Sequence, residues 1–360
     1  MVVYVVNIML TLILGVALIY TNPTPQKKKW FCGISSFLWI LISGLRHLSI
    51  GADTLKYADS FERAGRTTWA DVFSALHRVY FQGYSPENSA ENFFYKDPGY
   101  LLFQKIAHIF TDDYQVYLII IAIIFFAAMG RFVYKNSEDP CFSYILFSTL
   151  FYSFFAITGH RQTLATALVV FIGYEYIKEH KFWRFALIAL LAFMLHKSSL
   201  VFVPFFFVSR IRVDGKYLSA ILVFTAAVFA IGGRAILWMS NLFGFEKDAV
   251  NESPTYTFTT LMVLVAVVVL LSYYSVGTKS TQKNIEISAT TLAAVFALFA
   301  LLDQGMMRVQ QYYSLIMMLS MPSAFVTFKA KNRLLVTILC ILILFFLFVN
   351  TGARYKFFWQ

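Results

Sequence analysis

Charged side chains are scarce in this 360-residue chain, and their scarcity excludes an ordinary water-soluble domain. Only 14% of the residues are Asp, Glu, Lys or Arg, whereas soluble domains carry about 25%. Hydrophobic residues make up 59% of the chain and include 39 Phe, with 21 Tyr beside them. One water-facing globule cannot bury so much apolar surface, so we expect lipid to be a second solvent. The composition predicts an all-α integral membrane protein that crosses the bilayer many times.

Motifs for nucleotides and metals are also missing. The chain has no Walker-type loop and no GxGxxG, HExxH or DxD motif. Its three cysteines, Cys32, Cys141 and Cys340, lie far apart without CxxC spacing, which indicates neither a disulfide framework nor a cysteine metal site. We therefore expect no cofactor, no metal ion and no nucleic-acid partner. The energy for any reaction should come from an activated substrate and not from bound ATP.

Basic residues are absent before the first apolar run, residues 1–20. A secretory leader has a basic start and a small-residue cleavage site, so we interpret this run as a retained first helix. A spanning helix needs about 20 mostly apolar residues, and twelve runs approach that length. They cover residues 2–20, 30–45, 114–130, 141–158, 162–177, 183–195, 199–209, 217–233, 258–276, 286–302, 312–328 and 333–350. We treat residues 1–360 as a single transmembrane domain.

Two of these runs, 183–195 and 199–209, are short, and Pro204 interrupts the second. Irregular backbone at membrane depth is tolerated only where protein covers it or where it lines a wet cavity. We therefore expect the turn between the two runs to dip below the membrane surface.

Lys and Arg in the connectors predict the orientation of the helices. Every short connector on one side carries at least two of them, and such connectors stay in the cytoplasm. They contain Lys27–Lys29; Arg131 and Lys135; Lys178, Lys181 and Arg184; Arg210, Arg212 and Lys216; Lys279 and Lys283; and Lys329, Lys331 and Arg333. Both termini and two long segments, 46–113 and 234–257, are then expected outside. The first should contain short amphipathic helices, one of them near residues 100–110.

Four basic residues on the outer side break this pattern. Arg46, Arg161, Lys197 and Arg308 each adjoin apolar sequence, although an Arg at mid-bilayer costs about 2.5–3.5 kcal/mol on insertion scales. One interpretation is that each side chain extends its charge to the membrane surface. The other is that all four bind one anion, for which we expect a pyrophosphate. Arg161 opens a helix whose free N–H groups favour an anion, and guanidinium groups bind phosphate bidentately.

Two further residues are candidates for acid–base chemistry. Asp53 and Tyr57 lie four residues apart and would share one face of a helix. Asp53 either caps that helix or orients or deprotonates a sugar hydroxyl. His196 ends a very apolar helix and is either a packed residue, a base near neutral pH or a donor to phosphate. The acidic pair 112–113 is expected to cap a helix and not to bind a metal.

Five short motifs occur in order between about residues 46 and 322. They are Arg46 followed by Gly51-Ala-Asp53-Thr54, Tyr57 and Phe61; Asp97-Pro-Gly99-Tyr100; Arg161-Gln162 before Leu-Ala; His196-Lys-Ser-Ser followed by Pro204; and Arg308 with Tyr312-Tyr313 and Pro322. This series resembles that of EpsG-like proteins, a branch of the Wzy-type O-antigen and exopolysaccharide polymerases. Asp97 stands where that family has Glu.

The resemblance implies a GT-C-like glycosyltransferase in a bacterial plasma membrane, with its active site facing the periplasm or exterior. It would move a growing glycan from undecaprenyl diphosphate to the terminal sugar of the next lipid-linked repeat unit, in O-antigen, capsule or exopolysaccharide synthesis. The expected partners are this lipid-linked oligosaccharide, membrane lipids, a chain-length regulator and a flippase.

Site roles follow from the resemblance and from the residue types together. Arg161 and Arg308 are expected to hold the donor diphosphate, with Arg46 and Lys197 in support. Either Asp53 or His196 would handle the acceptor proton. Glycan contacts are expected from Tyr57, Gln162, Gln311, Tyr312 and Tyr313.

Other functions remain open at this point. A transporter or flippase for lipid-linked sugars would use similar cationic cavities, although the sequence lacks the repeated halves typical of transporters. A membrane-bound acyltransferase would use an intramembrane His such as His196. A glycan ligase would share both the fold and the diphosphate site.

Overall fold

The computed structural model describes residues 1–83, 89–242, 256–276 and 280–360, and within these ranges the chain forms helices and no strand. This confirms the predicted all-α class. Four of the described helices are long and apolar enough to cross a membrane: Val2–Tyr20, Tyr114–Asn136, Tyr256–Tyr274 and Asn332–Val349. Large apolar side chains are exposed on the helices, among them Leu222 at 70% and Phe346 at 67%. Lipid is the solvent that such surfaces require, so the protein is embedded in a membrane.

Each predicted span coincides with one helix or with consecutive helical segments. These are α1 (Val2–Gly15) with η1 (Val16–Tyr20), α2 (Pro25–Gly44), α7 (Tyr114–Asn136), α8 (Pro140–Leu146) with η2 (Phe147–Phe151) and η3 (Ser153–Thr158), α9 (His160–Thr166) with η4 (Ala167–Ile172) and α10 (Gly173–Lys178), α11 (Phe182–Leu195), η5 (Lys197–Phe202) with α12 (Phe205–Val208), α13 (Gly215–Ile231), α15 (Tyr256–Val276), α16 (Thr281–Phe299), α17 (Met306–Ser314) with α18 (Met317–Phe325), and α19 (Ala330–Val349). The interruption expected near Pro204 is present, because the 3₁₀ segment η5 ends there and α12 begins.

Segment 46–113 contains four short helices: α3 (Thr54–Arg66), α4 (Trp69–Phe81), α5 (Ser89–Tyr95) and α6 (Pro98–Ala107). Helix α6 occupies most of the stretch expected to be amphipathic, and α3 turns Tyr57 and Phe61 inward. The second long segment, 234–257, begins within α14 (Gly233–Leu242). Its remainder between 243 and 255 lies outside the described residues.

Local sequence explains where several helices begin. The side chains of Thr24, Asp113, Asp139 and Ser280 each accept a backbone N–H from the first turn that follows, which satisfies one of the free donors at a helix start. The cap expected from the acidic pair 112–113 is thus confirmed at Asp113. Proline at the first helical position in α2, α6 and α8 costs nothing, because no intrahelical partner awaits that N–H.

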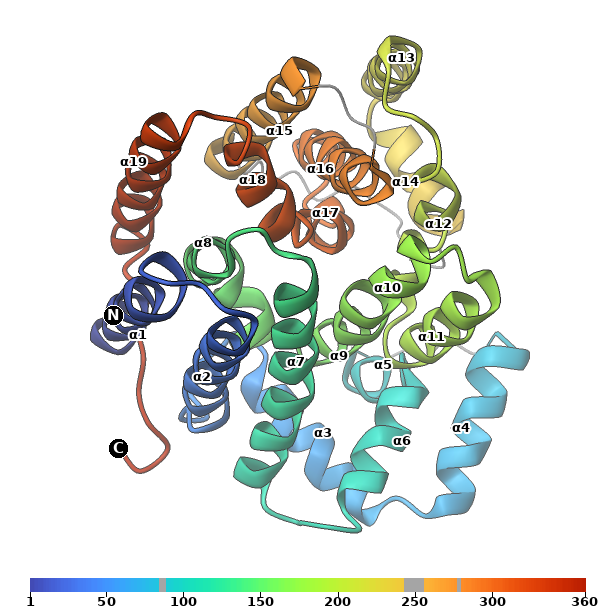
Figure 1. Ribbon diagram of the computed structural model, residues 1–360. Helices are drawn as coiled ribbons and strands as arrows, with labels where there is room; N and C mark the ends of the chain where they lie inside the picture. The colour runs from blue at the N-terminus through green and yellow to red at the C-terminus, as the bar shows by residue number, and fades with distance from the viewer. Residues whose placement is uncertain (84–88, 243–255, 277–279) are drawn as a thin grey trace.

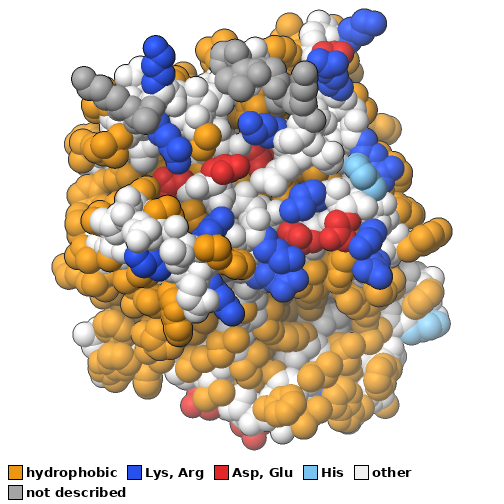
Figure 2. Space-filling model, viewed as in Figure 1, with side chains coloured by type: hydrophobic (Ala, Val, Ile, Leu, Met, Phe, Trp, Pro, Cys, Tyr) orange, Lys and Arg blue, Asp and Glu red, His pale blue; other side chains and the backbone are white. Residues whose placement is uncertain are grey.

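The helices form a bundle with a smaller layer at one end (Figure 1). Helices α2 and α7 pack along each other, as do α15, α16 and α17 with α18 in the upper part of the view. The short helices α3, α4 and α6 lie together at the bottom, where α6 packs against α11 and α3 against α7. On the face in Figure 2, hydrophobic side chains cover the lower half, whereas Lys and Arg gather mainly in the upper half.

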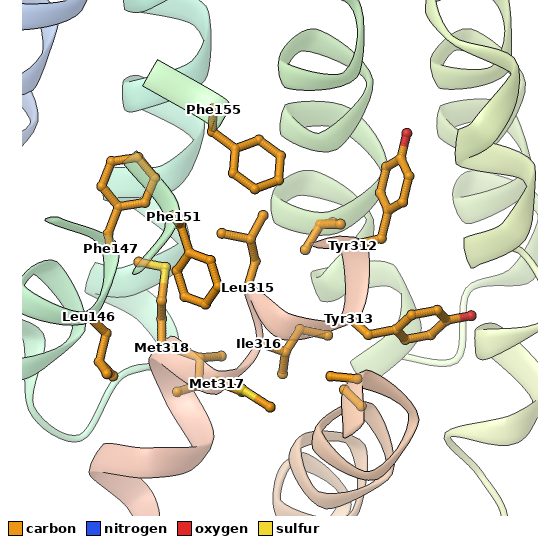
Figure 3. Close-up of a cluster of buried hydrophobic side chains, with 14 of the residues drawn as sticks. Leu146, Phe147, Phe151, Phe155, Tyr312, Tyr313, Leu315, Ile316, Met317 and Met318 are labelled. Carbon is orange, nitrogen blue, oxygen red and sulfur yellow. The ribbon is translucent and has the colours of Figure 1, made fainter. Parts of the chain in front are cut away.

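A buried cluster joins the middle of the chain to its last third. Phe147, Phe151 and Phe155, from η2 and η3, surround Leu315 and Met318 at the junction of α17 and α18 (Figure 3). All five side chains are at most 3% exposed. This packing fixes α17 against the segment that precedes α9, and so places residues 308 and 161 near the same cavity.

Candidate functional site

A cavity of about 380 Å³ opens where the outer segments of the predicted topology converge. Its lining comes from segment 46–113, from η3 and the start of α9 with the residue between them, from the residue after α11 and from the start of α17. The lining residues are Asp53, Lys56, Tyr57, Phe93, Lys96, Asp97, Phe154, Gly159, Arg161, Gln162, His196 and Arg308. Seven of these side chains are ionisable without counting tyrosine, in a chain that has few charges.

Asp97 is the buried centre of the site. It precedes Pro98 at the start of α6, but its carboxylate makes no cap bond to that helix and is fully buried. Instead Oδ2 lies 3.0 Å from His196 Nδ1 and 3.3 Å from Arg161 Nη1, and Oδ1 accepts the Lys197 backbone N–H at 3.1 Å. One carboxylate thus connects the start of α6, the end of α11 and the start of α9.

These donors keep Asp97 ionised. Burial alone would raise the pKa of its carboxyl, but His196, Arg161 and the Lys197 amide outweigh burial and hold that pKa below its usual range. An ionised carboxylate only accepts hydrogen bonds, so His196 Nδ1 must carry the proton. In the neutral imidazole Nε2 then keeps its lone pair. Because His196 lines the cavity, this nitrogen is suited to accept a proton from a bound hydroxyl.

Arg161 is clamped between the carboxylate and a set of rings. Its guanidinium carbon lies 4.3 Å from the centre of the Phe93 ring and 5.2 Å from that of Tyr100, and its Nη2 donates to the Phe93 carbonyl. The side chain is only 5% exposed, so it does not extend to the membrane surface. Its Nε has no partner among the described residues and is shielded from solvent, although the side chain as a whole lines the cavity.

Arg308 and Lys96 supply positive charge at the cavity, and among the described residues neither side chain forms an ion pair. Arg308 is exposed at the cavity, and the described part of the chain gives its guanidinium no ion pair. Burial lowers the pKa of Lys96; Asp97 opposes this, whereas Arg308, Arg161 and Lys197 lower it further. Cations this close together repel one another, and a bound anion would offset that repulsion.

The amide of Gln162 is held by neighbouring groups of α17. Its Nε2 donates to the Arg308 carbonyl at 2.9 Å and lies 3.3 Å from Gln311 Oε1. These two acceptors fix the amide, so Oε1 faces the other way and has no partner among the described groups. That oxygen is shielded from solvent, although Gln162 lines the cavity, and the glycan contact expected of Gln162 stays a prediction.

Asp53 lies at the rim of the cavity. It precedes α3, but its side chain makes no cap bond, so the capping interpretation is wrong. The carboxylate is 40% exposed and 3.5 Å from Lys56 Nζ. Tyr57, on the same helix, is buried and stacks on His160 with ring centres 4.2 Å apart. Asp53 therefore faces a cation and solvent, in contrast to the buried carboxylate that orients His196.

Arg46 lies behind the cavity and does not line it. Its side chain is 2% exposed, donates to the Ser43 carbonyl and places Nη2 2.7 Å from His160 Nε2. Through His160 it supports the ring of Tyr57. The interpretation that Arg46 extends to the membrane surface is thus wrong, and its geometry fits support of Tyr57 better than contact with a diphosphate.

Four other predicted residues also lie behind the lining. Lys197 contributes its backbone N–H to Asp97, and Gln311 contacts Gln162. The hydroxyl of Tyr312 lies 2.8 Å from Ser198 Oγ, and that of Tyr313 donates to the Val201 carbonyl at 2.8 Å. Both tyrosines join α17 to η5 and point away from the cluster in Figure 3.

Sequence reasoning did not assign site roles to Asp97, Lys96 and Phe93. The Asp-Pro pair reads as the start of a helix, and a cap is the usual role of such an Asp. A signal was nevertheless present, because Lys96-Asp97 is a charged pair directly before an apolar helix. Phe93 carries no signal of this kind, since one aromatic among 39 Phe does not stand out.

The assembled site can bind an anion and accept a proton. Arg308, Lys96 and Arg161 present positive charge, while the Asp97–His196 pair presents an oriented base. Within the described ranges, no group of three or more His, Cys, Asp and Glu side chains could hold a metal ion.

Comparisons with known proteins give one result. No curated protein matches the chain, and no solved structure matches it either. The model of the EpsG family matches residues 29–359. That match covers nearly the whole chain, including every residue that lines the cavity, and so this protein belongs to the EpsG family.

Proposed function

We propose that this protein is a polysaccharide polymerase that acts on glycans carried by undecaprenyl diphosphate. The growing chain would leave its lipid diphosphate and join the terminal sugar of an incoming lipid-linked repeat unit, in exopolysaccharide, capsule or O-antigen synthesis. Membership of the EpsG family suggests a Wzy-like polymerase. The observation that carries the proposal is a cavity in which unneutralised cations adjoin an Asp-oriented histidine.

The cations suit the diphosphate of the donor. Arg308, Lys96 and Arg161 line one cavity, and a diphosphate would relieve their mutual repulsion. Charge grows on the leaving oxygen as its bond to the sugar breaks, and fixed donors stabilise that charge without reorganising. Arg161, held by Asp97 and by rings, needs no movement to serve in this way.

The proposed reaction is one displacement or a pair of displacements at the anomeric carbon. The acceptor hydroxyl oxygen forms the new bond to that carbon, and the bond from the carbon to the diphosphate oxygen breaks. The electron pair of the broken bond leaves with undecaprenyl diphosphate. The hydroxyl proton passes to His196 Nε2, while Asp97 stabilises the imidazolium that forms, as a carboxylate does beside a histidine base. Asp53 is the second candidate for this proton.

The proposal includes an architecture. We propose twelve membrane spans in a GT-C-like arrangement, with the cavity at the outer face of the bacterial plasma membrane. Support comes from the grouping of segments. Ten of the twelve cavity residues belong to predicted outer segments, and the other two, Phe154 and Gln162, lie near the outer ends of predicted spans. Lys28 Nζ, by contrast, bonds the Ser137 carbonyl between two predicted cytoplasmic connectors. A flippase that delivers the repeat unit and a chain-length regulator are the partners that such an enzyme would need.

A product ladder tests the activity. Purified protein in detergent is incubated with a lipid-diphosphate-linked repeat unit, without nucleotide or added metal, and products are separated by size. We expect a ladder of longer glycans. Accelerated translocation of the lipid-linked sugar in liposomes, with no ladder, would instead favour a transporter.

Matched variants test the site. Arg308→Ala and Arg161→Ala should abolish the ladder, while Arg66→Ala should retain it. The Arg66→Ala substitution removes the same charge, but Arg66 is exposed, pairs with Glu62 and does not line the cavity. His196→Gln should lower the rate far more than Asp53→Asn does. A near-normal ladder from both Arg308→Ala and Arg161→Ala would remove the diphosphate site from this cavity.

A further inference from the structure

A second hollow, of about 650 Å³, lies on the opposite side of the protein from the cavity. It is bounded by the turn between α10 and α11, the link from α12 to α13 and the first turn of α16. Its lining residues are His180, Ser209, Arg210, Arg212, Ser280, Thr281 and Asn284. His180 precedes α11, and His196 follows it. The 14 residues of α11 separate the two sites by about 21 Å at 1.5 Å per residue.

The arginines of this hollow stand on an immobilised link. Asn284 Nδ2 donates to the carbonyls of Ser209 and Ile211, both at 2.9 Å. Its Oδ1 accepts the Val213 N–H at 3.1 Å. One side chain on α16 therefore holds the backbone on both sides of Arg210 and Arg212. Basic residues in a connector suffice for cytoplasmic orientation. Orientation alone therefore does not explain why Asn284 holds the backbone beside Arg210 and Arg212.

The hollow is positively charged and rich in hydrogen-bond donors. No Asp or Glu occurs among the described residues that line it, and both arginines are exposed. The Arg210 guanidinium lies 4.2 Å above the Phe206 ring, which orients it without neutralising its charge. Asp214 is close in sequence, but its carboxylate accepts the Tyr217 N–H at 3.0 Å and caps α13. Two guanidinium groups carried on a held backbone suit a phosphate, which they can bind bidentately.

Exposed apolar side chains lie next to the hollow in sequence. Phe207 is 54% exposed, Ile211 53% and Trp183 82%. Ile211 lies in the link from α12 to α13, Phe207 in α12 just before that link, and Trp183 at the start of α11. Basic pockets between membrane helices on the cytoplasmic side bind anionic lipid head groups. A soluble phosphate would gain nothing from apolar neighbours, whereas the acyl chains of a lipid would cover them.

We propose that this hollow binds the phosphate head group of an anionic phospholipid of the inner leaflet. Arg210 and Arg212 would hold the phosphate, the hydroxyls of Ser280 and Thr281 would bond the head group, and Phe207, Ile211 and Trp183 would contact the acyl chains. The site is separate from the polymerase cavity and does not depend on the activity proposed there.

Lipid binding to the purified full-length protein tests this site. Native mass spectrometry measures the affinity for phosphatidylglycerol and for phosphatidylcholine of matched chain length. The wild type should prefer phosphatidylglycerol by at least about tenfold, since each basic group near a lipid head group contributes about 1 kcal/mol. The double variant Arg210→Gln/Arg212→Gln should lose this preference. The matched control Lys27→Gln/Lys29→Gln removes the same charge from another predicted cytoplasmic connector and should retain it.

Further variants distinguish binding at this hollow from general attraction of lipids to surface charge. Asn284→Ala leaves the net charge unchanged but frees the link, and should reduce the preference; if it does not fold, the arginine pair decides alone. Equal loss in both double variants, or no loss in either, would overturn the proposal. Inorganic phosphate that displaces phosphatidylglycerol at equal concentration would assign the hollow to a soluble anion and would also overturn it.

Discussion

Replacing Asp97 by Asn removes one charge from the centre of the site and changes the shape of the side chain little. In the wild type three donors point at the carboxylate: His196 Nδ1, Arg161 Nη1 and the Lys197 N–H. An amide offers only one acceptor oxygen. In one orientation the amide oxygen faces His196 and Arg161, and the NH₂ group faces the Lys197 N–H. In the flipped orientation the oxygen faces the Lys197 N–H, and the NH₂ group faces His196 and Arg161. One donor is left unsatisfied in the first orientation and two in the second, and Arg161 loses its counter-ion in both.

The energetic cost follows from burial. Asp97 is fully buried and Arg161 is 5% exposed, and breaking a buried ion pair by removing one partner costs about 3–5 kcal/mol. The carboxyl is ionised at neutral pH because its pKa lies below the usual range. Its stabilising contribution is therefore complete above the pKa of an unfolded Asp and is lost only as the pH falls through the lower pKa of the folded state. Asp97→Asn should thus lower stability throughout the neutral range.

The loss of polymerisation rate in Asp97→Asn should exceed what the loss of stability alone would cause. Without the carboxylate, His196 is free to adopt the other tautomer, with its proton on Nε2, and such a change lowers the rate by about 10⁴-fold in a Ser-His-Asp triad. Unfolding in mixed micelles gives the stability, and the product ladder gives the rate. Asp97→Glu serves as the control because it keeps the charge, and it should retain more of both. A folded Asp97→Asn enzyme that polymerises within a few-fold of the wild-type rate would refute the role assigned to Asp97.

Four other substitutions, of which Gly33→Ala is a control, test further parts of the structure. Arg46→Lys should lower kcat by about ten- to a hundredfold with little change in KM, since a small misplacement of reacting groups costs this much and Arg46 does not line the cavity; steady-state polymerisation kinetics measure both constants. Lys96→Met should raise stability at neutral pH and yet weaken donor binding. Burial lowers the pKa of Lys96, so wild-type stability should rise as the pH rises through that value, and pH-dependent unfolding should show no such rise in the variant. Gly65→Ala would put a Cβ 2.8 Å from the His108 ring and should cost about 1–3 kcal/mol, whereas Gly33→Ala, which meets nothing within 4 Å, should gain up to about 1 kcal/mol in the same unfolding assay.

The helical architecture was predictable because lipid imposes one dominant rule. Apolar runs such as 114–130 and 333–350 become helices whatever their neighbours are, since only internal hydrogen bonds satisfy the backbone in lipid. The breaks were harder to locate. The run at 141–158 passes from α8 into η2 and η3, and its sequence contains no Pro or Gly between 141 and 158 to mark the change.

The site was predictable only as a set of anomalies. Basic residues on the outer side indicate that Arg46, Arg161 and Arg308 need a partner, but the sequence does not say which partner each has. The structure gives Arg161 a carboxylate and Arg46 a carbonyl and an imidazole. Arg308 has no ion pair within the described ranges. The partners lie 64 positions from Arg161 and 114 from Arg46 at His160, so no local pattern connects them.

The difference between these arginines changes how the charge anomaly should be interpreted. A buried guanidinium beside a carboxylate is nearly neutral as a pair, so its attraction for a diphosphate is reduced, and its value lies in holding a shape. An exposed guanidinium without a counter-ion keeps its full attraction. Arg161 therefore suits orientation of the leaving group, and Arg308, with Lys96 beside it, suits capture of the anion. The insertion cost of an outer arginine indicates that the residue has a role in the protein. Whether a carboxylate neutralises the arginine then distinguishes a role in orientation from a role in anion capture.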